Sequence, residues 1–134
     1  MGAWGTGIYD NDDAADWSVE VAELGLPVVE AALDAAIEAE FIEAPVGCCA
    51  LAAADVVARL VSGRGENTVY CEEVVAWVTA NAATPSTSLV AKATLVVERL
   101  RGADSELAEL WSENPAGLEE WSATLTDVEQ RLSA

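Results

Sequence analysis

The residues best suited to chemistry lie near the start of the chain, where carboxylates cluster. The run Asp10-Asn11-Asp12-Asp13 is followed closely by Asp16. Oxygen ligands of this kind can hold Ca²⁺ or Mg²⁺, but an EF-hand loop needs Gly at position 6 and Glu at position 12, where this chain has Ala15 and Val21. Asn and Asp also cap helix starts, and acids favour the positive end of the helix dipole. The cluster therefore predicts a helix N-cap, with weak divalent-cation binding or a recognition loop as alternatives.

Other catalytic or ligating groups are scarce in this chain. It has three Cys and no His, so the commonest general base and the commonest metal ligand are absent. Cys48 and Cys49 are adjacent, and successive residues of a helix point about 100° apart, which prevents both from facing one metal easily. Lys92, the only Lys, has no oxyanion-hole pattern near it. We therefore expect no enzyme activity, no cofactor and no metal, with small cysteines buried as reduced thiols.

The charge of the chain is large and unevenly distributed. Twenty-four acids and six bases give −18 at pH 7, and residues 1–58 hold twelve of those acids and no base. Such a charge excludes nucleic acid and anionic membranes as main partners, because each attracts basic surfaces. Within the predicted helix over 27–40, Glu30, Asp34 and Glu38 are four residues apart and therefore lie on one face. The sequence predicts either a solvated face or a surface for a basic protein partner. The candidate partner-binding residues are Asp10, Asp12, Asp13, Asp16, Glu30, Asp34 and Glu38.

Helical periodicity runs through the rest of the chain. We predict helices over 13–24, 27–40 and 45–62, a fourth capped by Asn67 or Thr68, and a fifth with Thr84-Pro85 as N-cap and first residue, ending before Gly102. A short sixth helix opens at Asp104-Ser105, and the last follows Asn114-Pro115 to Leu132. No segment alternates with period two. The expected fold class is all-α: one compact bundle of about seven short helices over residues 1–134, without β-sheet.

Two segments have predicted places in this bundle. The helix over 45–62 is apolar nearly all round, so we expect it at the centre, with Asp55 and Arg59 as an exposed i, i+4 pair. It is predicted to be too short and too weakly apolar to span a bilayer. Residues 1–12 form a Gly- and Trp-rich arm whose glycines let Trp4 and Tyr9 pack on the bundle. The five Trp residues mostly fall on apolar stripes and are expected to supply core.

The opening of the chain also resembles a known family. Gly2-Ala3-Trp4-Gly5-Thr6-Gly7-Ile8-Tyr9-Asp10-Asn11-Asp12-Asp13-Ala14, with Asp16-Trp17 after it, is similar to the start of the bacterial family called domain of unknown function 4259. The stretches over 39–45 and 104–111, and Trp121, are similar as well. The resemblance covers almost the whole chain. It implies a small, single-domain, mostly helical bacterial protein, and it supplies no catalytic residues.

These observations lead to one expectation about function and two alternatives. We expect a non-catalytic protein–protein interaction domain. The first alternative is an acidic inhibitor or immunity-type protein that masks a basic surface of a toxin or nuclease. The second is weak divalent-cation binding at the cluster from Asp10 to Asp16. The odd number of cysteines and the lack of a secretory signal predict a cytoplasmic location. A homo-oligomer is possible, although the acidic face disfavours self-association.

Overall fold

The helices begin and end where side-chain caps and glycines place them. The computed structural model describes residues 5–134. Its elements are α1 (Asp12–Leu24), α2 (Leu26–Glu38), α3 (Ala44–Ser62), the 3₁₀ turn η1 (Val69–Cys71), α4 (Glu72–Ala80), α5 (Thr87–Arg101), α6 (Glu106–Ser112) and α7 (Pro115–Leu132). The side chain of Asn11 caps α1 by accepting the N–H of Ala14 at 2.8 Å. Gly25, in the left-handed region with φ of +73°, then separates α1 from α2 in a single residue.

Apart from shifts of one residue, three helix boundaries differ from the prediction. Thr68 caps the 3₁₀ turn η1, and α4 itself starts at Glu72 without a side-chain cap. The fifth helix starts at Thr87, because the hydroxyl of Ser86, and not that of Thr84, accepts the N–H of Leu89. The second helix ends at Glu38 and not at residue 40. There the Arg99 guanidinium donates to the carbonyls of Ala36 and Ile37, the latter at 3.0 Å, so a side chain from α5 satisfies the last carbonyls of α2.

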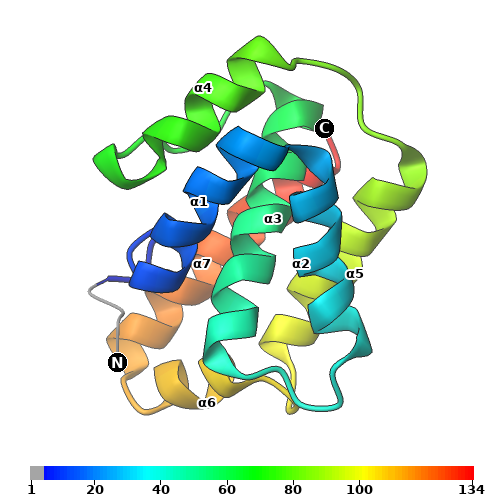
Figure 1. Ribbon diagram of the computed structural model, residues 1–134. Helices are drawn as coiled ribbons and strands as arrows, with labels where there is room; N and C mark the ends of the chain where they lie inside the picture. Colours follow the sequence, from blue (N-terminus) through cyan, green and yellow to red (C-terminus); the bar gives the residue numbers. More distant parts are fainter. Residues whose placement is uncertain (1–4) are drawn as a thin grey trace.

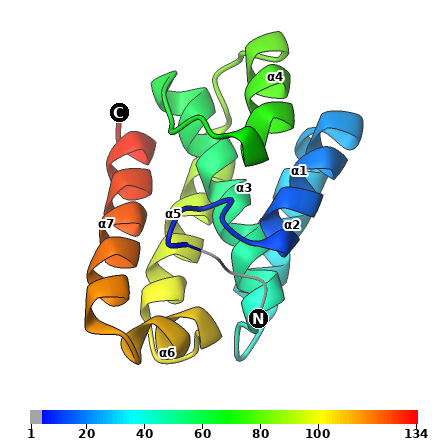
Figure 2. The ribbon, with the colours of Figure 1, turned by 90° about the vertical axis from the view of Figure 1, so that its left-hand side faces the viewer.

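Helix α3 occupies the centre of the bundle, as predicted, and every other α-helix contacts it. Figure 1 shows α5 next to α2, and Figure 2 shows the α1–α2 pair and α7 on opposite sides of α3. By length and composition α3 could cross a membrane, contrary to the sequence prediction, because the helix runs for 19 residues. Within the bundle 67% of this span is buried. Its apolar character thus serves packing against six neighbouring helices.

Main-chain hydrogen bonds join the loop between α2 and α3 to the loop between α5 and α6. Ile42 donates to the carbonyl of Asp104 at 2.8 Å and accepts from the N–H of Glu106 at 2.9 Å. This isolated bridge is the only β-type pairing among residues 5–134, which form no strand. The all-α prediction is therefore confirmed for the described part of the chain.

The described part of the N-terminal arm packs on the bundle through Tyr9, which is buried. Asp10 closes the turn before it by accepting the N–H of Gly7 at 3.1 Å. A Cβ added at Gly5 or Gly7 would lie 2.6 Å from the Asp10 carboxylate, so a side chain at either position would have to displace that carboxylate. The predicted packing of Trp4 concerns a residue outside the described range. Of the other Trp residues, Trp17 and Trp121 are buried and Trp77 and Trp111 are half-buried.

Candidate functional site

An apolar groove lies between α1 and α2, with the start of α3 against it. Its volume is about 630 Å³. Small side chains of α2, including Ala31 and Ala35, leave it open, and Leu24 at the end of α1 is 64% exposed beside it. The lining residues are Asp13, Trp17, Glu20, Leu24, Pro27, Val28, Ala31, Ala32, Ala35, Pro45, Val46 and Cys49. A large apolar side chain left in water next to such a hollow is typical of a binding surface.

Carboxylates of α1 border this groove. Asp13 and Glu20 line it, and Asp16 lies between them on the same helix. Cys49, a half-buried residue of the groove lining, lies close enough to feel these charges. Burial raises the pKa of its thiol to about 11, and the negative charges of Asp13, Glu20 and Asp16 raise it further. The groove therefore carries a negative potential. The same effect keeps the thiol protonated at neutral pH, so Cys49 is a poor nucleophile.

No base of the described residues forms an ion pair with the carboxylates of α1. Within residues 5–134 the ion pairs reach Glu30, Asp34, Asp55, Asp127 and Glu129. None of those acids belongs to α1. Asp12, Asp13 and Asp16 are also exposed, whereas Asp10 is half-buried.

The acids of α2 have a different environment. The ammonium of Lys92, on α5, lies 3.0 Å from a carboxylate oxygen of Glu30 and 2.9 Å from one of Asp34. The hydrogen bonds that Lys92 donates to the carboxylates of Asp34 and Glu30 raise its pKa. Glu38 is exposed and has no ion pair in the described structure. The seven predicted partner-binding residues thus do not form one equivalent surface. Asp10 and the three acids on α1 have no ion pair in the described structure, while two of the three on α2 share the single ammonium of Lys92.

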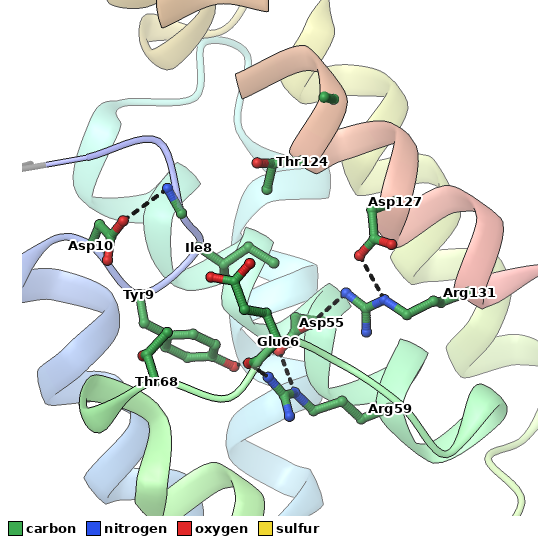
Figure 3. Close-up of a pocket in the computed structure, with 12 residues that line it drawn as sticks. Ile8, Tyr9, Asp10, Asp55, Arg59, Glu66, Thr68, Thr124, Asp127 and Arg131 are labelled. Carbon is green, nitrogen blue, oxygen red and sulfur yellow. Dashed lines mark hydrogen bonds and ion pairs between the residues drawn. The ribbon is translucent and has the colours of Figure 1, made fainter. Parts of the chain in front are cut away.

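Apart from the groove, a network of polar side chains lies inside the bundle around Asp55 (Figure 3). One carboxylate oxygen of Asp55 accepts the Arg59 Nε–H at 2.7 Å and the Tyr9 hydroxyl at 2.9 Å. The other accepts from the Arg131 guanidinium at 2.7 Å. Asp55 is only 1% exposed and Arg59 6%. The predicted exposed pair is therefore wrong in its burial: α7 and the arm cover this face of α3, and Arg131 supplies a second cation.

The remaining guanidinium hydrogens are also largely used. Arg59 donates to the side-chain oxygen of Asn67 at 2.9 Å and to the carbonyl of Glu66. Arg131 donates to Asp127 at 2.9 Å and to the carbonyl of Arg64 at 3.1 Å. These bonds join α3, α7 and the loop between α3 and η1. Burial, followed by the nearby Asp55 charge, raises the pKa of Tyr9 well above its usual value, so this phenol cannot act as a base near neutral pH.

A cavity of about 250 Å³ opens beside this network. Its walls carry two guanidinium groups and a larger number of acids, namely Asp10, Asp55, Glu66 and Asp127. An anion would meet this excess of negative charge and few free donors. We therefore interpret the Asp55 network as a clamp that holds the arm, α3 and α7 together, and not as a ligand site.

The acidic cluster at the start of α1 acts as a helix cap in the structure, through Asn11 and the acids of the first turn. Among residues 5–134, no three His, Cys, Asp or Glu side chains converge in a way that could hold a metal ion. All three cysteines are free thiols. Of the adjacent pair predicted to be buried, Cys48 is buried and Cys49 is half-buried in the groove, and Cys71 is buried as well. Nothing in the described geometry gives the cation alternative a site.

Comparison with known proteins agrees with the resemblance noted in the sequence. A family model described as a domain of unknown function, DUF4259, matches residues 2–124. The chain belongs to the DUF4259 family. No curated protein and no solved structure matches it. The DUF4259 match covers both the groove and Asp55, but ends before Asp127 and Arg131.

Sequence reasoning identified Asp13 and Asp16 as candidate residues beside the groove, but it missed Glu20 and the groove itself. Its floor consists of Ala31, Ala35, Val28 and Cys49, which look like ordinary helix-packing residues. One available signal was Leu24, an apolar residue placed directly before the helix-ending Gly25. The i, i+4 spacing of Ala31 and Ala35 was another, since small residues on one helix face leave room for a neighbour.

Proposed function

We propose that this DUF4259 protein is a non-catalytic protein-interaction domain whose docking surface is the groove between α1 and α2. The observation that carries the proposal is the combination of an apolar floor with a border of acids that lack internal partners. Apolar floors supply affinity, and unpaired border charges supply orientation and faster encounter. The thiols with raised pKa and the fully bonded Asp55 network support a role without catalysis.

The acidic inhibitor is a second candidate, favoured by one specific observation. The α1 carboxylates face solvent, and no Lys or Arg in the described part of the chain pairs with them, so they can be presented to a basic protein. On this reading the partner is a toxin or nuclease whose basic surface is masked. Three free thiols support placing either function in a reducing bacterial cytoplasm, because disulfides are rare there.

The proposal is tested by photo-crosslinking in the native host. A photoreactive residue at exposed Ala35 lies in the groove, and the same residue at Ala22, exposed on α1 but not lining the groove, is the control. We expect a defined crosslinked protein from position 35 and none from position 22. Equal crosslinking from both positions, or none from position 35, contradicts the interaction domain. If the crosslinked protein is a basic nuclease or toxin, the inhibitor candidate is favoured.

A further inference from the structure

We infer that the occupant of the groove is a short amphipathic α-helix with apolar residues on one face and basic residues along its flanks. The inference rests on the proposed function and specifies its partner. It follows from three properties of the groove: its length, its lack of main-chain hydrogen-bonding groups for an extended peptide, and the sign of its border charges.

The length of the groove suits a helix of about three turns. On α1 its lining runs from Asp13 to Leu24. Eleven helical steps at 1.5 Å each span about 16 Å, the length of a helix of roughly eleven residues. Such a helix presents anchors at i, i+3 or i+4, and i+7 to one groove. Exposed Leu24 at one end and the open space over Ala31 and Ala35 can receive those anchors.

A helix also fits the groove better than an extended segment does. An extended peptide needs a sheet edge or another row of free main-chain groups, because its own N–H and C=O groups are unpaired. The groove lies between helices whose main-chain groups are already bonded, and residues 5–134 contain no strand. Its lining is dominated by Ala, Val, Pro, Leu and Trp side chains. A helix satisfies its main chain internally and can bury one apolar face here.

The flanks of that helix are basic because the groove is bordered by acids alone. Asp13 and Glu20 line it, Asp16 adds to its potential, and none of the three has an ion pair in the described structure. A second copy of this chain is a poor occupant, because each copy carries a formal charge of −18. An acidic helix would meet the same repulsion.

The test uses three labelled synthetic peptides of fourteen residues and the full chain. The first has Leu at i, i+3, i+4 and i+7 and Lys along the flanks. The second replaces those Leu residues by Ser, and the third replaces the Lys residues by Glu. Fluorescence anisotropy at low and high salt measures binding. We expect only the first peptide to bind well, with an affinity that falls about tenfold or more as salt is raised.

Matched variants place the binding in the groove. Ala35→Phe fills the floor with little effect on the core, because Ala35 is exposed, and should weaken the first peptide about tenfold or more. Ala22→Phe adds the same apolar side chain outside the groove and should leave affinity unchanged. The double change Asp16→Lys, Glu20→Lys should weaken binding mainly at low salt. The double change Glu98→Lys, Glu119→Lys, at exposed positions on α5 and α7, is its control. Circular dichroism confirms that each variant is folded.

The outcomes separate this inference from the proposed function. Equal binding of the Ser peptide shows attraction by charge alone and overturns the amphipathic helix, as does equal binding of the Glu peptide. Loss of affinity in both Phe variants places the contact outside the groove and overturns it too. Absence of peptide binding together with a specific crosslink from position 35 overturns the helix but retains the interaction domain. Absence of that crosslink contradicts the interaction domain itself.

Discussion

The acids of α1 and the buried Asp55 are the same kind of group in opposite environments. All belong to the first 58 residues, which contain no base. Asp16 and Glu20 lie on the surface and form no ion pair within residues 5–134. Asp55 is nearly inaccessible and is bonded by two guanidinium groups and a phenol. A count of charges treats these groups alike. The acids of α1, however, are accessible to a partner, whereas the oxygens of Asp55 already accept hydrogen bonds within the protein.

The difference has a simple energetic basis. Burying an unpaired carboxylate costs several kcal/mol, so Asp55 persists inside only because Arg59, Arg131 and Tyr9 compensate it. An exposed carboxylate is solvated and needs no protein partner. Lack of an internal partner on α1 therefore costs the fold little and leaves the charge free for recognition. Four sets of substitutions test this contrast, and their expected effects decrease from Asp55 to the acids of α1.

Removing the buried carboxylate should cause the largest loss. Asp55→Ala leaves two buried guanidinium groups without their shared counter-charge and should lower the free energy of unfolding by about 3–5 kcal/mol. Urea denaturation followed by circular dichroism measures the change. Asp127→Ala, which removes a half-exposed partner of Arg131, is the control and should cost about 0–1 kcal/mol. Similar losses in both variants would refute the special role of Asp55.

Removing the phenol should have the next largest effect. Tyr9→Phe deletes one hydrogen bond to a buried carboxylate and should cost about 1.5–3 kcal/mol near neutral pH. Because the pKa of Tyr9 is raised in the folded state, its stabilisation is complete below pH 10, the ordinary value, and is lost as the pH rises further. Stability should therefore fall less steeply above pH 10 in the variant. An identical alkaline slope in both proteins would contradict this.

Reversing one acid of α2 should have a smaller effect that depends on position. Asp34→Lys places a second ammonium beside Lys92 and should lower the midpoint of thermal unfolding slightly at low salt. High salt should remove the difference, because the pair is exposed to solvent. Glu38→Lys, on the same face but without an ion pair, should cause no such loss. Equal effects from the two changes would mean that the Lys92 pair does not distinguish these acids.

Reversing the acids of α1 should affect stability least. Asp16→Lys with Glu20→Lys removes exposed charges that have no ion pair, so the free energy of unfolding should stay within about 0.5 kcal/mol of the original. The same variant should lose peptide binding at low salt. A large loss of stability here would show that these acids hold the fold, and the contrast with Asp55 would collapse.

Much of the fold could be read from local patterns. Asn11 and Asn114 cap helices as predicted, and α3 occupies the centre because its polar strip is so narrow. The fifth helix start was missed by a few residues, since Thr84-Pro85 offers a plausible cap but Ser86 makes the bond. The pairing of Asp55 with Arg59 could be predicted from their i, i+4 spacing. The burial of this pair could not, because no residue near it in the sequence indicates that α7 and the N-terminal arm cover that face of α3.

By itself the sequence determined the helices, most of their caps and the acidic character of the first half. These properties depend on residues within about one helical turn of one another. Only the tertiary structure decided which acids are free. Lys92 reaches Glu30 across 62 positions, and Arg131 reaches Asp55 across 76. The groove also arises only when α1 and α2 pack on α3. Among residues 5–134, helix packing brings distant bases to some carboxylates but to none of those on α1. Neither the charge count nor the helical periodicity therefore reveals which acids a partner can reach.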